Sequence, residues 1–260
     1  SSANTTVTSF NGYYFHEEDR ENIIKSGSEW YGEKFEILTS YSFNVDFANV
    51  DQSAPMRVEV DVAAASKALS SFNVTVGNNS MKLNVDPISG NYATAAAYSD
   101  YNSMSIVPPG SRFNVKIDYS KPLESSIGWL NYIKINGRRK LIFTGNQMAY
   151  RDLNSVGASN VAQFVLTGAT SKLKIWDITE HVNPKNQLFE KSGSQISYNV
   201  STDFLREFIA FDDFDSTISF VGRVVNQNLH GLSNPEMIIV THSLFTSAAE
   251  RLADFHREEG

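Results

Sequence analysis

Apolar residues at alternate positions dominate the first 234 residues of this chain. Val58, Val60 and Val62 alternate with Glu59 and Asp61, the pattern of a strand with one buried and one hydrated face. Roughly a dozen short runs of this kind follow one another, separated by turn-forming residues, with little helical spacing. The pattern predicts a mainly β fold: a jelly-roll-like β-sandwich, or two packed sandwiches. A length of 260 residues allows either one large β domain or two small ones.

Two turn sequences predict hairpins within this series. Gly77-Asn78-Asn79-Ser80 separates two alternating runs, 72–76 and 81–85. Asn136-Gly137 lies between the runs 128–135 and 139–143, and Asn-Gly is the strongest short-range hairpin signal. We therefore expect an antiparallel hairpin at each position.

The pattern changes after Pro235. Met237 to Val240 form an unbroken apolar run, which is typical of a strand covered on both faces in a parallel sheet. Helical spacing follows, with apolar residues at Phe245, Ala248, Ala249, Leu252 and Phe255. This order predicts the first strand and helix of an α/β domain, of which one βα unit cannot bury its apolar faces alone.

The expected organisation has four parts. They are an N-terminal extension (1–30), a β-sandwich region (31–226), a linker (227–234) and the start of an α/β domain (235–260). If the rest of the α/β domain is absent, residues 235–260 are expected to pack back on the β region or to pair with a second copy of the chain in a dimer.

Composition excludes several classes of function. The formal net charge of −7 disfavours nucleic acid as a partner, because cations must outnumber carboxylates near phosphates. The chain has no cysteine, so it can form no disulfide, thiolate metal site or cysteine nucleophile. No phosphate loop, dinucleotide fingerprint or metalloprotease motif occurs, and we predict no cofactor, no metal site and no catalytic residue in this stretch.

An ordered set of short stretches resembles one family. The stretches are Gly128–Ile133 with Asn136–Arg139, Gln147–Asp152, Ile175–Thr179, Leu205–Phe211, and Asn226–Gly231 leading into Met237–His256. In this order they resemble the region that precedes the catalytic domain of PorU-like proteins, the gingipain-type cysteine peptidases of the type IX secretion system. The resemblance extends over most of the chain from Trp30 onward.

The resemblance implies a function for the parent protein. PorU-like proteins are large surface proteins of Gram-negative bacteria. They act as C-terminal signal peptidases and sortases: they remove the sorting signal of secreted cargo at the outer membrane and attach the cargo to lipopolysaccharide. Their peptidase domain has a caspase-like α/β fold with a His–Cys dyad that lies beyond the positions matched here.

For this chain, the resemblance implies a non-catalytic region followed by a truncated caspase-like domain. The implied location is the outer membrane or cell surface. The implied partners are the downstream peptidase domain, the outer-membrane components of type IX secretion and the secreted cargo.

Three residues are candidates for a cleft or surface site. His242 follows the predicted strand 237–240, at the edge where α/β sheets bind ligands. Trp30 and Tyr31 lie on a turn-rich segment between two glycines and could stack on a sugar ring. They keep open an alternative from another class, a stand-alone carbohydrate-binding or adhesion module. We expect Trp129 and Trp176, which lie within alternating runs, in the core.

Overall fold

The computed structural model describes residues 2–91, 94–213, 219–231 and 234–259. The chain divides into two compact units, Ser1–Phe214 and Asp215–Gly260. The boundary therefore comes twelve residues before the predicted end of the β region at residue 226.

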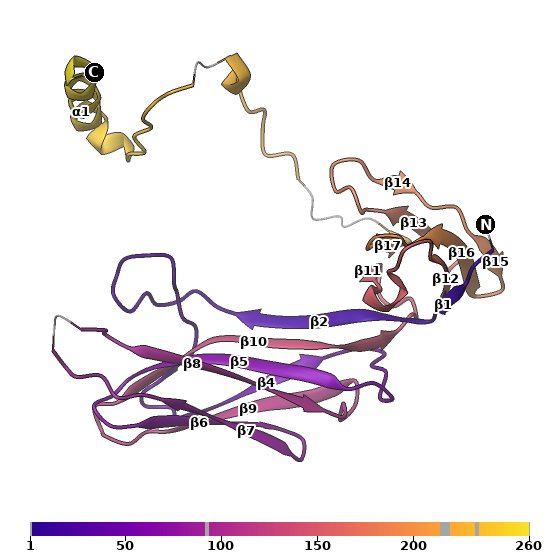
Figure 1. Cartoon of the computed structure of the whole chain (residues 1–260), viewed down its shortest axis with the longest axis horizontal. Helices are drawn as coiled ribbons and strands as arrows, with labels where there is room; N and C mark the ends of the chain where they lie inside the picture. Colours follow the sequence, from indigo (N-terminus) through magenta and orange to yellow (C-terminus); the bar gives the residue numbers. More distant parts are fainter. Residues whose placement is uncertain (1, 92–93, 214–218, 232–233, 260) are drawn as a thin grey trace. The chain divides into compact units, whose positions relative to one another are not determined.

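The first unit contains two sandwiches, each made of two sheets (Figure 1). In the first sandwich, one sheet has the order β2 (Ser9–Glu17), β10 (Ile127–Lys140), β5 (Met56–Ala65), β8 (Tyr98–Ile106), and β3 (Lys34–Phe35) also pairs with β10. The other sheet has the order β4 (Ser40–Asp46), β9 (Arg112–Ser120), β6 (Ser70–Val76), β7 (Asn79–Val85). From β4 to β10 the chain changes sheet at every step except the β6–β7 hairpin, as in a jelly-roll-like sandwich.

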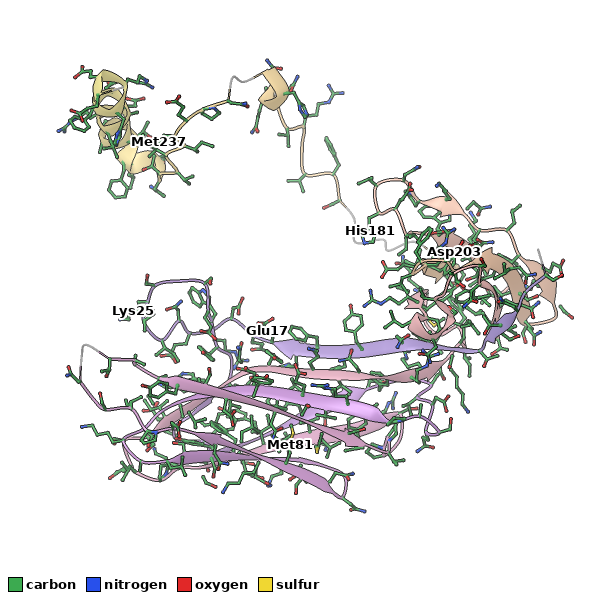
Figure 2. All side chains as sticks on the ribbon, viewed as in Figure 1. Glu17, Lys25, Met81, His181, Asp203 and Met237 are labelled. Carbon is green, nitrogen blue, oxygen red and sulfur yellow. The ribbon has the colours of Figure 1, made fainter. Side chains whose placement is uncertain are left out.

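The core of the first sandwich confirms the alternation in the sequence. Val58, Val60 and Val62 are fully buried between the sheets, together with Phe72 and Ile133. The side chains of both sheets fill the space between them (Figure 2).

The second sandwich has its own core. Its sheets have the orders β1 (Thr5–Val7), β12 (Val161–Leu166), β16 (Gln195–Ser201), β15 (Glu190–Ser192) and β11 (Gln147–Arg151), β17 (Glu207–Phe211), β13 (Lys174–Asp177), β14 (Lys185–Asn186). Aromatic rings occupy its centre: Phe164 stacks on Tyr198 with centroids 5.4 Å apart, and both contact Phe208. The hydroxyls of Tyr150 and Tyr198 are 2.8 Å apart and satisfy each other inside this core. Of the two arrangements predicted, the described residues form two packed sandwiches.

Strands β2 and β10 join the sandwiches. They pair from Tyr132–Glu17 to Lys140–Ser9, and the side chains at one end, Phe10 and Leu141, belong to the second core. A short 3-10 helix, η1 (Leu153–Ser155), follows β11 at the same junction.

A buried ion pair fixes this junction. Arg138 Nη1 lies 2.6 Å from Asp152 Oδ1, with side chains 15% and 3% exposed. Arg138 also donates to the carbonyl and hydroxyl of Ser9 (2.7 and 2.8 Å) and to Asn11 Oδ1 (2.9 Å). Because a desolvated pair is stable only when its remaining donors and acceptors are satisfied, these bonds hold the second sandwich to the strands of the first.

Of the two predicted hairpins, one is confirmed and one is wrong. Gly77 and Asn78 connect β6 to β7, with Gly77 at φ +57°. Asn136-Gly137 forms no turn, because β10 continues through it and Gly137 pairs with Gly12 of β2. A Cβ on Gly137 would lie 3.2 Å from Met56 Cε and 3.3 Å from Phe47 Cε1, so this glycine permits close packing rather than a turn.

The predicted N-terminal extension (1–30) is wrong for residues 5–17. Thr5–Val7 pair in parallel with β12, and Ser9–Glu17 pair with β10. The sequence does not indicate this pairing, because Phe10 enters a core whose other residues, apart from Val7, lie more than 130 positions away.

In the second unit, the predicted helix is confirmed and the predicted strand is wrong. A 3-10 turn η2 (Leu229–Gly231) is followed by η3 (Ser243–Phe245) and α1 (Thr246–Glu259). Residues 237–240 pair with no strand among the described residues, and Val240 is 94% exposed. A strand needs hydrogen-bonding neighbours, and the described part of this unit has no sheet to supply them.

Candidate functional site

The predicted aromatic pair does not form an exposed platform. Trp30 is 43% exposed, but Tyr31 is only 6% exposed and packs with Ala63 and Trp129 on the outer face of the β5–β10 sheet. Burial, together with the neighbouring carboxylate of Glu29, raises the pKa of Tyr31 well above its usual range. Tyr31 is therefore wrong as a surface residue, and Trp30 remains as a single exposed ring.

The other two tryptophans differ in exposure. Trp129 is buried as predicted, and its Nε1 donates to Glu21 Oε2 at 2.9 Å. Trp176 is 37% exposed and lies edge-on to Phe211 at 5.0 Å, so its predicted core position is wrong.

His242 caps the start of η3. Its Nδ1 accepts a hydrogen bond from Leu244 N at 3.2 Å, and its ring lies edge-on to Phe245. The strand that would have placed His242 at a sheet edge is absent from residues 237–240. The structure therefore gives His242 a local capping role.

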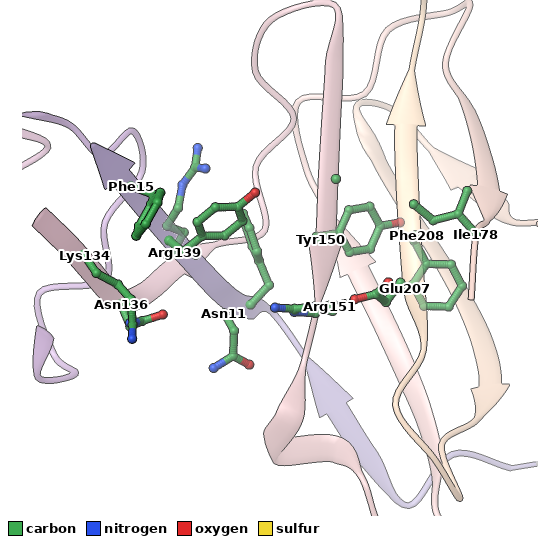
Figure 3. A pocket seen from close by; sticks show the side chains of 14 residues that line it. Asn11, Phe15, Lys134, Asn136, Arg139, Tyr150, Arg151, Ile178, Glu207 and Phe208 are labelled. Carbon is green, nitrogen blue, oxygen red and sulfur yellow. Dashed lines mark hydrogen bonds and ion pairs between the residues drawn. The ribbon is translucent and has the colours of Figure 1, made fainter. Parts of the chain in front are cut away.

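A groove lies at the junction of the two sandwiches and holds a cavity of about 500 Å³ (Figure 3). Strands β2 and β10 form one wall, and β11, β17 and Ile178 form the other. A second hollow shares Asn11, Tyr13 and Lys134 with it and extends over β5 to Arg57 and Glu59. We call this combined surface the junction groove.

Strand alternation places aromatic rings along the junction groove. Tyr13 and Phe15 project from the outer face of β2 and are 70% and 47% exposed. Register sets Tyr13 beside Asn136 and Phe15 beside Lys134 of β10. Phe15 also stacks on Tyr132, with centroids 5.7 Å apart. Exposed rings with polar neighbours are a common feature of recognition surfaces.

Cations outnumber carboxylates in the junction groove. Glu59, only 8% exposed, accepts hydrogen bonds from Lys134 Nζ (2.9 Å) and Arg57 Nη2 (3.2 Å). The bond from Lys134 lowers the pKa of Glu59, so this carboxylate stays ionised. Arg151 pairs with Glu207 on the opposite wall.

Arg139 adds a fourth cation to the junction groove. Its Nε donates to the Ala48 carbonyl at 2.6 Å, and its guanidinium lies 5.2 Å from the centre of the Phe10 ring. Four cations thus line the groove with two carboxylates, in a chain whose net charge is −7. This local excess suits a partner rich in carboxylate or carbonyl oxygens.

One acidic residue beside the groove is poorly solvated. Asp61 lies next to Tyr132 and Tyr101 across the sheet, and its Oδ1 is buried without a hydrogen-bond partner among the described residues. Burial, followed by the charges of nearby carboxylates, raises the pKa of Asp61 to about 6, although a hydrogen bond with Asn131 opposes the shift.

The alternation along β2 is a sequence signal for the junction groove. Asn11, Tyr13 and Phe15 alternate along β2, but they lay in the segment expected to be an extension. The second wall could not be foreseen, because Arg151 approaches β2 only through the packing of two sandwiches.

The structure also shows a cluster that no motif indicated. Among the described residues, one group of three metal-ligating side chains lies close together: His16, Glu18 and Glu33. The described helices include none with the length and apolar character needed to cross a membrane.

Comparison with known proteins identifies the fold. No protein-family model matches the sequence, and no curated protein matches it. Among solved structures, dimeric latent PorU from Porphyromonas gingivalis matches with a TM-score of 0.76 at 19% identity, covering 99% of this chain and 25% of that one. The fold is PorU-like. The expected resemblance to PorU is thus confirmed at the level of the fold, and the chain spans about a quarter of PorU's length.

A second solved structure matches this chain only weakly. The insecticidal delta-endotoxin Cry8Ea1 from Bacillus thuringiensis matches with a TM-score of 0.28 at 18% identity, covering 39% of this chain and 18% of the toxin. A TM-score this low carries no argument about fold.

Proposed function

We propose that this chain is a non-catalytic region of a gingipain-like cysteine peptidase of the type IX secretion system. The observation that carries the proposal is that 99% of the chain matches a quarter of PorU. The parent protein would process C-terminal sorting signals of secreted cargo at the outer membrane. The chain itself would be exported to the cell surface and would be catalytically inert, because it has no cysteine to serve as the nucleophile.

The proposed role of the chain is to hold the downstream peptidase domain of the same protein. The junction groove supports this role, because it combines the exposed rings of Tyr13 and Phe15 with an excess of cations from two rigid sandwiches. The buried Arg138–Asp152 pair keeps the two walls together, so a partner would meet a preformed surface. Cargo and other outer-membrane components of the secretion system would be further partners.

The reading frame of the gene provides the first test. We expect it to continue beyond Gly260 into an α/β domain with a His-Gly pair and a later cysteine. A frame that stops at Gly260 would refute the proposal. The chain alone should cleave no peptide, and turnover that resists serine and metal inhibitors would place the chemistry elsewhere than we propose.

A reconstitution experiment tests the role of the groove. This chain and the remainder of its parent are produced separately, and their affinity is measured by calorimetry. Tyr13→Ser should weaken binding at least tenfold, since exposed aromatic anchors carry much of the energy of an interface. Tyr101→Ser is the matched control, because Tyr101 is 66% exposed on β8, the opposite edge of the same sheet. Equal effects of the two substitutions would exclude the groove as the docking surface.

One observation favours a second candidate, a carbohydrate-binding or adhesion module. Tyr13 and Phe15 are exposed beside the amides of Asn11 and Asn136, an arrangement that could stack on and hydrogen-bond a sugar. Binding of a glycan by this chain that Tyr13→Ser abolishes, together with a reading frame ending at Gly260, would favour this alternative.

A further inference from the structure

Three side chains that can ligate a metal meet where β2 ends and the chain enters β3. One ligand atom from each of His16, Glu18 and Glu33 lies within 4.8 Å of the others. His16 comes from β2, Glu18 follows that strand, and Glu33 immediately precedes Lys34 of β3. The cluster lies apart from the residues that line the junction groove.

The backbone fixes the positions of these residues. Glu21 and Tyr31 exchange two hydrogen bonds (2.9 and 3.0 Å) and close the loop that joins Glu18 to Glu33. Leu130 N donates to the carbonyl of Glu33 at 2.9 Å, which ties this residue to β10.

Gly32 allows the two acidic residues to approach each other. A Cβ at this position would lie 3.0 Å from the carbonyl oxygen of Glu18 and 3.3 Å from Glu18 Cβ. A larger residue here would require Glu18 to shift by a few tenths of an ångström, so glycine favours this close approach. The cluster is therefore held by the main chain rather than by flexible side chains alone.

Glu33 has a buried carboxylate oxygen that the protein leaves unsatisfied among the described residues. It is 6% exposed, and its Oε1 lies 3.0 Å from His16 Nε2. Its Oε2 is buried without a hydrogen-bond partner among the described residues. A buried carboxylate oxygen without a donor is costly, and a bound cation is one of the few groups that can offset this cost.

The neighbours of the cluster restrict one of its side chains and bring one guanidinium to its exposed side. The ring of Phe43 packs on the His16 imidazole, with centroids 4.7 Å apart, and restricts its orientation. Arg20 pairs with Glu18 Oε2, which places one positive charge at the more exposed side of the cluster. That pair leaves the buried Oε2 of Glu33 unsatisfied.

From this geometry we infer that His16, Glu18 and Glu33 bind one divalent transition-metal ion of the Zn²⁺ or Mn²⁺ class. One imidazole nitrogen and two carboxylates suit such ions, whereas Ca²⁺ takes an all-oxygen set with more ligands. Three protein ligands leave coordination positions for water. The ion would link the end of β2 to the residue that precedes β3. This inference does not depend on the proposed function.

The test is calorimetric titration of the full chain with Zn²⁺ after treatment with EDTA, accompanied by thermal unfolding with and without the ion. We expect one saturable site per chain and a rise in Tm, since an ion that binds only the folded state stabilises it. Titration with Co²⁺ should give the visible absorption of a nitrogen- and oxygen-ligated ion.

Variants assign the site. Glu33→Gln, His16→Gln and Glu18→Gln should each weaken Zn²⁺ binding tenfold or more and remove most of the rise in Tm. Glu17→Gln is the matched control, because Glu17 is an exposed neighbour outside the cluster.

Glu18→Gln keeps the test decisive if the other two variants fail to fold. The Glu18 side chain is 40% exposed, so its substitution should leave the fold intact. The absence of saturable Zn²⁺ binding would overturn the inference. Binding that survives all three substitutions would do so as well, because the ion would then be held by one of the other four histidines.

Discussion

Similar apolar residues are buried in one unit of the chain and exposed in the other. In Ser1–Phe214, Val58, Val60 and Val62 are fully buried between sheets. In Asp215–Gly260, Ile238 is 75% exposed and Val240 is 94% exposed. The apolar pattern therefore predicts which side chains can be buried. Whether they are buried depends on the strands and helices available to cover them.

The largest contrast should come from removing one phenylalanine in each unit. Phe72 is fully buried and packs on Phe35 and Tyr119, so Phe72→Ala should lower the free energy of unfolding by about 3–5 kcal/mol. Phe255 of α1 is 54% exposed, and Phe255→Ala should change it by less than about 0.5 kcal/mol. Urea denaturation measures both. A comparable loss in the two variants would mean that α1 packs against a core in solution.

The next largest loss of stability should come from breaking the ion pair at the junction of the two sandwiches. Arg138→Ala should cost about 3 kcal/mol, because it leaves Asp152 charged and buried without its partner. Arg112 pairs with Asp46 at the surface, where the side chains are 85% and 61% exposed, so Arg112→Ala should cost about 0–1 kcal/mol. Hydrogen exchange should also show faster opening of η1 and β11 in the Arg138 variant. Equal costs would show that the junction is not held by its ion pair.

The ionisation of the Asp61 carboxyl should make the first unit, Ser1–Phe214, less stable as pH rises. Its pKa is raised to about 6 in the folded chain, whereas an unfolded aspartate releases its proton near pH 4. Between these values the folded state holds more protons, so its free energy of unfolding falls as pH rises from about 4 to 6. Asp61→Asn should remove this fall and stabilise the chain at pH 8 by about 1–2 kcal/mol, a value reduced because part of the carboxyl remains hydrated.

Unfolding curves at pH 4.5 and pH 8 provide the check. Because pH 4.5 is already above the pKa of an unfolded aspartate, the stabilisation by Asp61→Asn should fall there to roughly a third of its value at pH 8. Asp86→Asn, which alters an exposed carboxylate that is not among the charges acting on Asp61, is the control. A variant that is equally stabilised at both pH values would refute the titration of Asp61 as the cause.

The strands could be predicted because alternation is a local property. Val58 and Val60 of β5 are each flanked by charged residues on both sides, whatever the strand pairs with. The hairpin at Asn136-Gly137 failed for the opposite reason: the role of Gly137 is set by Met56 and Phe47, which are distant in sequence. Local patterns indicate where strands lie, whereas contacts between residues distant in sequence determine where a strand ends or continues.

The candidate sites were largely beyond prediction. The junction groove needs Tyr13 of β2 to lie near Arg151 of β11, and only the docking of two sandwiches achieves this. The cluster of His16 and Glu33 depends on a loop closure whose spacing matches no metal-binding motif. Tyr31 was misjudged because a turn-rich segment can still fold back over a sheet.

The smallest expected effect on the β unit is that of removing the second unit. A chain ending at Asn234 should have a free energy of unfolding within about 0.5 kcal/mol of that of the full chain, because Ser1–Phe214 and Asp215–Gly260 form separate compact units.

The tendency of the chain to form dimers should change more than its stability. Met237 and Ile239 line an open hollow of about 790 Å³ against α1, and leaving such side chains hydrated forgoes roughly 1.5–3 kcal/mol each. We expect residues 235–260 to cover this surface by pairing with a second copy of the chain. Light scattering should then show a dimer for the full chain and a monomer for the chain ending at Asn234. Two monomers, with free amide exchange at residues 237–240, would exclude pairing. Loss of folding in the shortened chain would show instead that residues 235–260 complete the β unit.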